Sequence, residues 1–444
     1  MVAIPPKHRS FLTSPAGIQA KSIPAPEGFS LVTSHVYTKI ALFFENVHKD
    51  PGFMHWPRLK ASLEGALNHY YPLTGRLVKG NNGRYDITNF EKGALFEVAD
   101  SVDDFQEYKR SNFSYSVVPF EEMIAVQSYV SRDSPLFGAK IVYTRCGSCV
   151  LNFSFHHKVM DGWCLTQFLA LFARLSRGET IEEDELHMYT DKDRKPVQPL
   201  PGLNHAELYP RYAPGEAPPP TIQMGPSKKL IFSFERSVMK KLKASVLEDA
   251  GQPKAKLSQF DILSSFVHRA IVKARRAPED SCADMLCIVS NHHQHPDYDM
   301  VKYLGNFIMP VPLHNTAQEV LDKGIFQVAT ELRAKTRSVT VPFMESLEHY
   351  FNTSPNVEEI TSPISSLARG AVGFSDWSRF VNNFDLGYGP YVRLRSFVET
   401  SPLALITVMP YLPDTIEVII QLDRRSMDRL VTDRDFMSYV KCIN

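Results

Sequence analysis

The stretch from Asn152 to Trp163 reads NFSFHHKVMDGW and constrains the fold more than any other part of the chain. It begins as an apolar run of residues favoured in strands and stops at two histidines. After Asp161 and Gly162, apolar residues recur at helical spacing, at Leu165, Phe168, Leu169, Phe172 and Leu175. The pattern predicts a buried strand, a sharp loop and a helix, with His157 and Asp161 held at the junction.

His157 is the candidate general base of this loop. A buried strand delivers its last side chain to one reproducible position, and an imidazole titrates close to neutral pH. Alternation along the strand sends His156 to the opposite face, so we expect no chemistry from it. We expect Gly162 to let the backbone turn tightly directly after the acidic residue.

Charge and hydropathy exclude several classes of protein. Lys plus Arg and Asp plus Glu each number 49, so the formal net charge is zero and we expect no nucleic-acid partner. No apolar run approaches the roughly 20 residues of a membrane helix, so we expect no membrane partner. Residues 1–10 carry charges without the apolar core of a secretory signal, which favours a cytoplasmic location.

The six cysteines and the clustered histidines are not expected to bind metal. Cys146 and Cys149 form a CxxC that lies between two expected strands, Lys140–Arg145 and Val150–Phe155, so a hairpin turn is the simpler interpretation. Three histidines fall between Asn291 and His295, but no carboxylate or cysteine pattern accompanies them. We predict no metal site and a reducing compartment.

The clearest boundary in the chain is a proline-rich segment over residues 191–228. Such a segment cannot sustain a helix or a central strand, so we interpret it as an extended crossover. It separates an N-terminal half, residues 1–190, from a C-terminal half, residues 229–444. The length of 444 residues suits two domains.

Local patterns predict further elements on both sides of this boundary. Residues 30–47 alternate enough to predict a strand. Pro57 should open a helix, in which Leu59, Leu63 and Leu67 repeat every four residues. The strands Ala404–Met409 and Thr415–Leu422 should close the chain as a hairpin.

Five blocks of sequence together resemble the BAHD acyl-CoA-dependent acyltransferases. In chain order they are the helix with YPLTGRL (Leu59–Leu77), HHKVMDG (His156–Gly162), SQFDIL (Ser258–Leu263), YLGN (Tyr303–Asn306) and the segment Gly373–Pro390. The resemblance implies an α/β fold of two similar chloramphenicol-acetyltransferase-like domains. Each would have a mixed β-sheet flanked by helices, with the active-site channel between the domains. It also implies that about residues 372–391 return to the first domain.

The same resemblance implies an activity and assigns residues to it. An acyl group would pass from acyl-CoA, a co-substrate rather than a bound cofactor, to a hydroxyl or amine of a small specialised metabolite. His157 would be the base, with Asp161 and Gly162 shaping its loop. Ser375 would bond the oxyanion, and Trp377 and Trp163 would contact substrate. The family's habit implies a monomer.

Residues near the end of the chain take structural roles in this comparison. Asp385, Gly387 and Gly389 match a family turn remote from the chemistry. The basic residue that the family places before Pro390 is missing. The family's arginine partner of the loop aspartate is also missing, and His293, or His292 if loop lengths differ, stands in its place. An imidazole cannot form the forked pair that an arginine forms.

Two other functions stay open at this point. The pair His156–His157 followed by Met160–Trp163 is as similar to carrier-protein-dependent condensation domains as to BAHD enzymes. A free-standing domain of that kind would take its acyl group from a carrier protein. The lost arginine and the lost basic residue before Pro390 also leave room for a non-catalytic relative that binds acyl-CoA without turnover.

Overall fold

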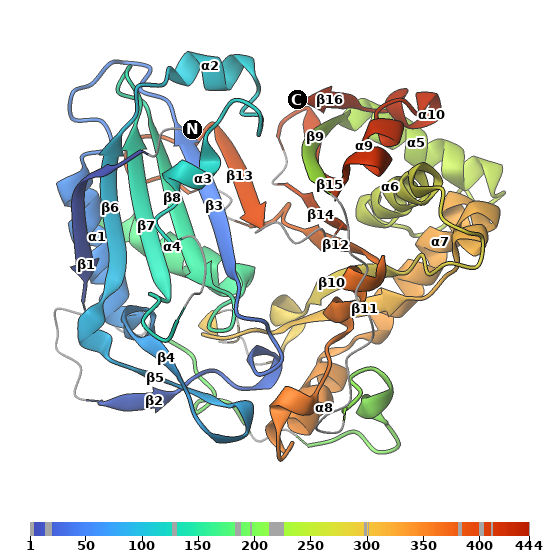
Figure 1. Cartoon of the computed structure of the whole chain (residues 1–444), viewed down its shortest axis with the longest axis horizontal. Helices are drawn as coiled ribbons and strands as arrows, with labels where there is room; N and C mark the ends of the chain where they lie inside the picture. The colour runs from blue at the N-terminus through green and yellow to red at the C-terminus, as the bar shows by residue number, and fades with distance from the viewer. Residues whose placement is uncertain are drawn as a thin grey trace.

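The computed structural model describes residues 4–13, 20–126, 131–182, 188–195, 198–212, 226–296, 300, 302–380, 384–398, 404–409 and 412–443. Two mixed β-sheets, each with its own helices, form two bodies that lie side by side (Figure 1). The expected fold class is confirmed. No helix among the described residues is long and apolar enough to cross a membrane.

The first body is built on a six-stranded sheet. Its strands, in spatial order, are β1 (Pro6–Leu12), β6 (Ala94–Asp100), β7 (Phe137–Tyr143), β8 (Cys149–His156), β3 (Tyr37–Phe44) and β13 (Arg393–Val398). Only β6 and β7 run parallel, and the other neighbours are antiparallel. A small sheet of β2 (Ser22–Pro24), β5 (Tyr85–Thr88) and β4 (Arg76–Lys79) lies beside it.

Helices cover both faces of the first sheet because its strands are apolar on both sides. Leu42 and Leu151 share a core with α1 (Trp56–His69) and α4 (Gly162–Ser176). Phe43 and Val150, the next residues on the same strands, pack instead on α2 (Phe105–Arg110) and α3 (Phe120–Met123). The fully buried β8 follows from this two-sided cover.

The elements that carry the site form as their local sequence predicts. Gly147, at φ +79°, makes the turn of the β7–β8 hairpin. The helix α1 begins at Trp56 with proline in its first turn, and it buries Leu59, Leu63 and Leu67. The helix α4 begins at Gly162 directly after β8 and its loop.

The second body is built on a seven-stranded sheet. Its strands, in spatial order, are β11 (Ile308–Leu313), β10 (Met285–Ser290), β12 (Val372–Asp376), β14 (Ala404–Val408), β15 (Thr415–Asp423), β9 (Ser227–Glu235) and β16 (Lys441–Ile443). Its helices are α5 (Arg236–Asp249), α6 (Gln259–Arg275), α7 (Ala317–Ser338), α8 (Val341–Asn352), α9 (Arg424–Leu430) and α10 (Arg434–Met437). The expected closing hairpin is the antiparallel pair β14–β15.

The crossover over residues 191–228 packs mostly as irregular chain. Its described parts hold one short 3-10 helix, η6 (His205–Glu207), and a bridge from Arg211 to Ile360, before β9 begins at Ser227. Leu200 and His205 bond the hydroxyl of Ser346 on α8. Of the prolines in the segment, Pro196, Pro214 and Pro218–Pro220 lie outside the described residues.

Two sequence-based expectations need correction. Residues 372–376 do not return to the first domain, because β12 lies between β10 and β14 with its apolar side chains in the second core. The strand that crosses is β13, which lies beside β3 (Figure 1). Phe384 and Leu386 do pack into the first core. The strand expected over 30–47 begins only at Tyr37, because a 3-10 helix, η1 (Gly28–Ser30), precedes it.

A buried ion pair joins the two sheets where β13 crosses. Arg395 on β13 and Glu417 on β15 lie 2.5 Å apart, with side chains 0% and 2% exposed. Arg393 and Asn112 also bond the Glu417 carboxylate. Burial opposes the charge of Glu417, but Arg395 and Arg393 outweigh it and lower the pKa of this carboxyl. The pair therefore holds the halves together with both partners ionised.

We predict that Glu417→Gln lowers the free energy of unfolding by about 3–5 kcal/mol, because two buried guanidiniums lose their counter-charge. Urea denaturation at neutral pH measures this loss. A carboxyl with a lowered folded-state pKa stabilises above its unfolded pKa, and this stability is lost as pH falls through the folded pKa. The difference between wild type and variant should therefore shrink below about pH 4.5. Glu107→Gln, an exposed change on α2, is the control, and an equal effect of both changes would refute the role of the pair.

Candidate active site

The backbone of β8 places His157 at the edge of the first body. His156 is the last residue of β8 and pairs with Tyr37 of β3. The next amide, that of His157, still donates to Val36 O at 2.8 Å, so the loop starts from a fixed point. The residues on either side of His157 are buried, whereas the imidazole is half-buried. The strand thus delivers the ring to a partly open position, as the sequence predicts.

A hydrogen bond from the second body orients the His157 ring. Its Nδ1 lies 3.0 Å from Oδ1 of Asn306, just before β11. The amide nitrogen of Asn306 donates to His157 O at 2.7 Å and to Ser30 Oγ at 3.0 Å, which leaves Oδ1 as the acceptor. Nδ1 must therefore carry the proton. The lone pair of Nε2 is left to accept a proton from a substrate.

Asn306 is a site residue that the sequence did not single out. It lies in the YLGN block that carried the resemblance, but nothing in its local pattern indicates contact with a histidine 149 positions away. Its backbone N–H also bonds Ser30 Oγ, and its side chain is fully buried. The available signal was Asn306 itself, a polar residue in the otherwise largely apolar segment before β11.

Asp161 shapes the loop by capping α4. Its Oδ1 accepts from the amides of Trp163 and Cys164, both at 3.0 Å. Its Oδ2 accepts from the amide of Phe307 at 3.0 Å. The helix N-terminus favours a negative charge at this point. Among the described residues the carboxylate bonds backbone N–H groups rather than the imidazole of His157.

Of the two histidines considered as partners of Asp161, the structure places His292 there. Its Nε2 lies 3.4 Å from Asp161 Oδ2, and its Nδ1 lies 2.8 Å from Ser290 Oγ. Burial lowers the pKa of His292 despite the nearby carboxylate, so the ring is neutral at neutral pH. His293 instead lies against the ring of Trp163, at 4.1 Å between centroids. The preferred assignment of His293 is wrong, because the buried His292 occupies the position beside Asp161.

The clustered histidines have separate surroundings rather than a shared ion. His295 bonds Glu345 Oε1 at 3.1 Å, on the side of α8. Within the described residues, no three His, Cys, Asp or Glu side chains are grouped to hold a metal ion.

Gly162 is required for a different reason from the one expected. It is the first residue of α4 and does not belong to the glycines with positive φ. A Cβ at this position would lie 2.6 Å from Cε2 of Phe380. The glycine therefore lets an aromatic ring approach the start of the helix closely.

Phe380 brings the Ser375–Trp377 segment to the same place. Its ring lies 5.9 Å from that of Trp377 and 6.3 Å from that of Trp163. Trp377 Nε1 donates to Ser375 Oγ at 2.9 Å, which leaves the Ser375 hydroxyl proton available for another acceptor. Ser375, Trp377 and Trp163 are each half-buried. The predicted residues thus gather around the first turn of α4.

Asp385, Gly387 and Gly389 lie at the opposite end of α4. The carboxylate of Asp385 accepts from the amides of Gly387 and Gly389 at 2.8 and 3.0 Å. Both glycines have positive φ, at +88° and +89°. Ser176, the last residue of α4, bonds Leu386 O at 2.8 Å. A helix of 15 residues is about 22 Å long, so this turn is remote from His157.

Lys158 is a second site residue that the sequence did not single out. Its Nζ is buried and donates to Ser30 O and Leu31 O at 3.0 and 2.9 Å. Burial lowers the pKa of Lys158 to about 8. The side chain therefore connects η1 to residues 157–161, the base loop. The same η1 supplies the Ser30 hydroxyl that Asn306 contacts.

Comparison with known proteins identifies the family of the chain. Residues 29–437 match the Transferase family. The chain is 23% identical to shikimate O-hydroxycinnamoyltransferase of Nicotiana tabacum, covering 81% of this chain and 82% of that protein. It is 24% identical to a hydroxycinnamoyl-CoA:5-hydroxyanthranilate N-hydroxycinnamoyltransferase of Avena sativa, covering 76% of each.

Solved structures share the fold over nearly the whole chain. F. sporotrichioides TRI101, in complex with coenzyme A and T-2, superposes with a TM-score of 0.78 at 18% identity, covering 96% of this chain and all of that one. Vinorine synthase superposes with a TM-score of 0.71 at 17% identity, covering 99% and 98%. The chain belongs to the Transferase family, the BAHD acyltransferases that its motifs resemble.

Proposed function

We propose that this protein transfers an acyl group from acyl-CoA to a hydroxyl or amine of a small specialised metabolite. One observation carries the proposal: the bond from His157 Nδ1–H to Asn306 leaves Nε2 as a free proton acceptor in a partly open position. The names of the relatives support both kinds of acceptor, since one is an O-transferase and the other an N-transferase. A structural neighbour was crystallised with coenzyme A.

Proton transfer through His157 is the core of the mechanism. The acceptor oxygen or nitrogen attacks the thioester carbonyl carbon while His157 Nε2 takes its proton. The tetrahedral intermediate then collapses, the carbon–sulfur bond breaks, and the imidazolium returns the proton to the CoA sulfur. The transfer is direct and needs no acyl-enzyme. Burial raises the pKa of Cys164, which lies in the first turn of α4, so its thiol stays protonated and is no nucleophile.

Ser375 is proposed to stabilise the oxyanion of the intermediate. Its Oγ already accepts the indole N–H of Trp377, which orients the hydroxyl so that its own proton can be donated. Trp377 and Trp163, joined through Phe380, would form the wall of a substrate channel between the two domains. The proposed channel opens on the half-buried face of His157.

A cytoplasmic monomer is the form in which we propose the enzyme works. All six cysteines are free, which suits a reducing compartment. The proposed site is complete within one chain, because His157 comes from the first body while Asn306 and Ser375 come from the second. Acyl-CoA is a co-substrate, and the proposal requires no other cofactor.

We predict that His157→Gln lowers kcat for acyl-CoA-dependent acyl transfer by about 10²–10⁴-fold, because the acceptor loses its general base. Free-thiol release from acetyl-, malonyl-, benzoyl- and coumaroyl-CoA, with pooled alcohols and amines, measures this loss. His314→Gln, an exposed change, is the matched control. Thiol release only from acyl groups on a carrier protein would favour the condensation activity, and acyl-CoA binding without turnover would refute an enzyme.

We predict that Ser375→Ala lowers kcat by about 10²–10³-fold with little change in KM, because the hydroxyl acts on charge that exists only in the transition state. Trp377→Phe should lower kcat in the same direction, since it removes the N–H that orients Ser375, and a change in KM would report its effect on the channel wall. Steady-state kinetics with the preferred acyl-CoA measures both. An unchanged kcat in Ser375→Ala would assign the oxyanion to another donor.

A further inference from the structure

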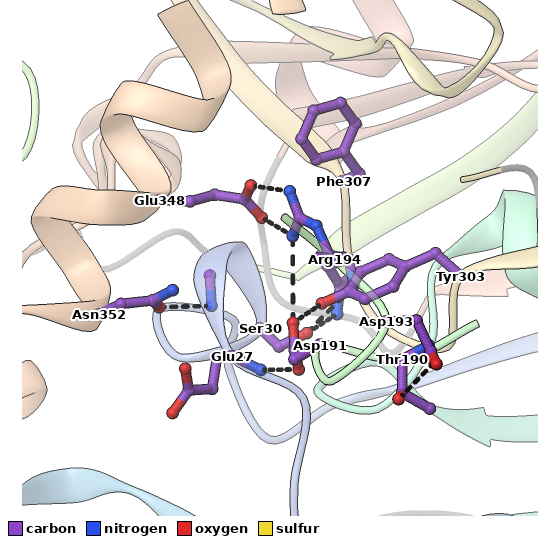
Figure 2. A network of polar contacts seen from close by, with 12 residues as sticks. Glu27, Ser30, Thr190, Asp191, Asp193, Arg194, Tyr303, Phe307, Glu348 and Asn352 are labelled. Atoms are coloured by element: carbon purple, nitrogen blue, oxygen red, sulfur yellow. Dashed lines mark hydrogen bonds and ion pairs between the residues drawn. The ribbon is translucent and has the colours of Figure 1, made fainter. Parts of the chain in front are cut away.

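A network of polar contacts joins the crossover to α8, to Tyr303 and to the backbone of Glu27 (Figure 2). Its centre is Arg194, which comes from the crossover between the two halves. Its Nη1 and Nη2 lie 2.9 and 2.5 Å from the two carboxylate oxygens of Glu348 on α8. The two side chains are 9% and 1% exposed. This is a forked, desolvated pair, the geometry in which an arginine is most strongly held.

The guanidinium of Arg194 also lies over two rings of the segment that precedes β11. It is 5.2 Å from the ring centre of Tyr303 and 5.6 Å from that of Phe307. Figure 2 shows Tyr303 and Phe307 on either side of Arg194. Cation–π contacts gain strength in a desolvated site. Arg194 therefore contacts the first and the last residue of the loop from Tyr303 to Phe307.

The crossover holds this loop by further bonds. The hydroxyl of Tyr303 donates to Asp191 Oδ1 at 2.8 Å, and the amide of Leu304 donates to Tyr189 O at 2.8 Å. Asp191 Oδ2 accepts from the amide of Glu27 at 2.9 Å, next to η1. The same carboxylate therefore ties together the crossover, the loop and η1.

The loop from Tyr303 to Phe307 forms four hydrogen bonds with the base loop. The side-chain nitrogen of Asn306 donates to His157 O, and Gly305 O accepts from the amide of Asp161 at 3.1 Å. Asn306 accepts the Nδ1 proton of His157, and the amide of Phe307 bonds Asp161. These hydrogen-bonding groups belong to the segment whose first and last residues, Tyr303 and Phe307, contact Arg194. A loop carries such contacts accurately only where neighbouring side chains fix it.

We propose that Arg194, paired with Glu348, is a positioning residue that sets the tautomer and orientation of His157 through the Tyr303–Phe307 loop. The assignment rests on the proposed role of His157 as base. Without the guanidinium the loop loses its cation–π contacts and its tie to α8. Asn306 then no longer presents Oδ1 at one place, and the His157 proton is shared between Nδ1 and Nε2.

The test compares variants that separate positioning from folding. Arg194→Met removes the charge and leaves Glu348 unpaired. The double variant Arg194→Met with Glu348→Leu replaces the whole pair by apolar side chains, which restores stability in many buried ion pairs. Lys140→Met is the matched control, since it breaks another buried pair, with Glu97, in the first body. Asn306→Ala is the positive control for a lost tautomer.

The measurements are thermal midpoints, kcat, KM and the ring ¹⁵N shifts of selectively labelled histidine. The chain has 15 histidines, and the His157 signals are assigned by their absence in His157→Gln. Both Arg194 variants should show mixed tautomers at His157, as Asn306→Ala does. Their kcat should fall by about ten- to a hundredfold, with the KM for acyl-CoA within about twofold of wild type. The double variant should recover the thermal midpoint but neither the tautomer nor kcat.

A double variant with the wild-type tautomer and kcat would overturn the proposal, as would a Lys140→Met control that disturbs the tautomer equally. If the double variant does not fold, Arg194→Lys decides, because it keeps a cation beside Glu348 but loses the fork and the flat guanidinium over both rings. It should shift the tautomer in the same direction, and an unchanged tautomer would overturn the proposal. Absence of acyl-CoA turnover in wild type refutes the proposed function, whereas the tautomer arm still decides the role of Arg194.

Discussion

The hydrogen bond between His157 Nδ1 and Asn306 Oδ1 is the interaction on which the arrangement depends, because it crosses between the two bodies. The imidazole belongs to the end of β8, and the amide belongs to the approach to β11. Neither body alone specifies the tautomer. In the proposed mechanism the second body therefore does more than line the substrate channel, since its hydrogen bond leaves Nε2 of His157 as the proton acceptor.

Two buried ion pairs join parts of the chain that are far apart in sequence. Arg395–Glu417 joins β13 of the first sheet to β15 of the second, and Arg194–Glu348 joins the crossover to α8. Buried pairs contribute little net stability compared with apolar packing, but a structure that separates the two partners loses much of its free energy of unfolding. They therefore suit an interface whose register matters. Ile419, beside Glu417, packs into the first core and supplies the apolar part of the same interface.

Sequence patterns predict what depends on neighbours in the chain. The strand, loop and helix around His157, the β7–β8 hairpin and the leucine stripe of α1 all follow from local periodicity. The contacts that sequence could not reveal join distant residues. Asn306, Lys158 and His292 have roles set by partners over a hundred positions away. The position of β13 at the edge of the first sheet also depends on tertiary packing. Its residues would suit an edge strand of either sheet.

The contacts of Asp161 explain how its loop can form without the arginine that the family places there. A buried carboxylate needs compensation, and three backbone N–H groups at and near a helix N-terminus supply it here, with no Lys or Arg side chain paired with it among the described residues. His292 is neutral beside it and adds a polar neighbour rather than a counter-charge. The loop can thus keep its shape although the forked ion pair is absent. The missing arginine is therefore compatible with an intact loop, and of the two departures that motivate a non-catalytic relative, only the missing basic residue before Pro390 is left without a structural explanation.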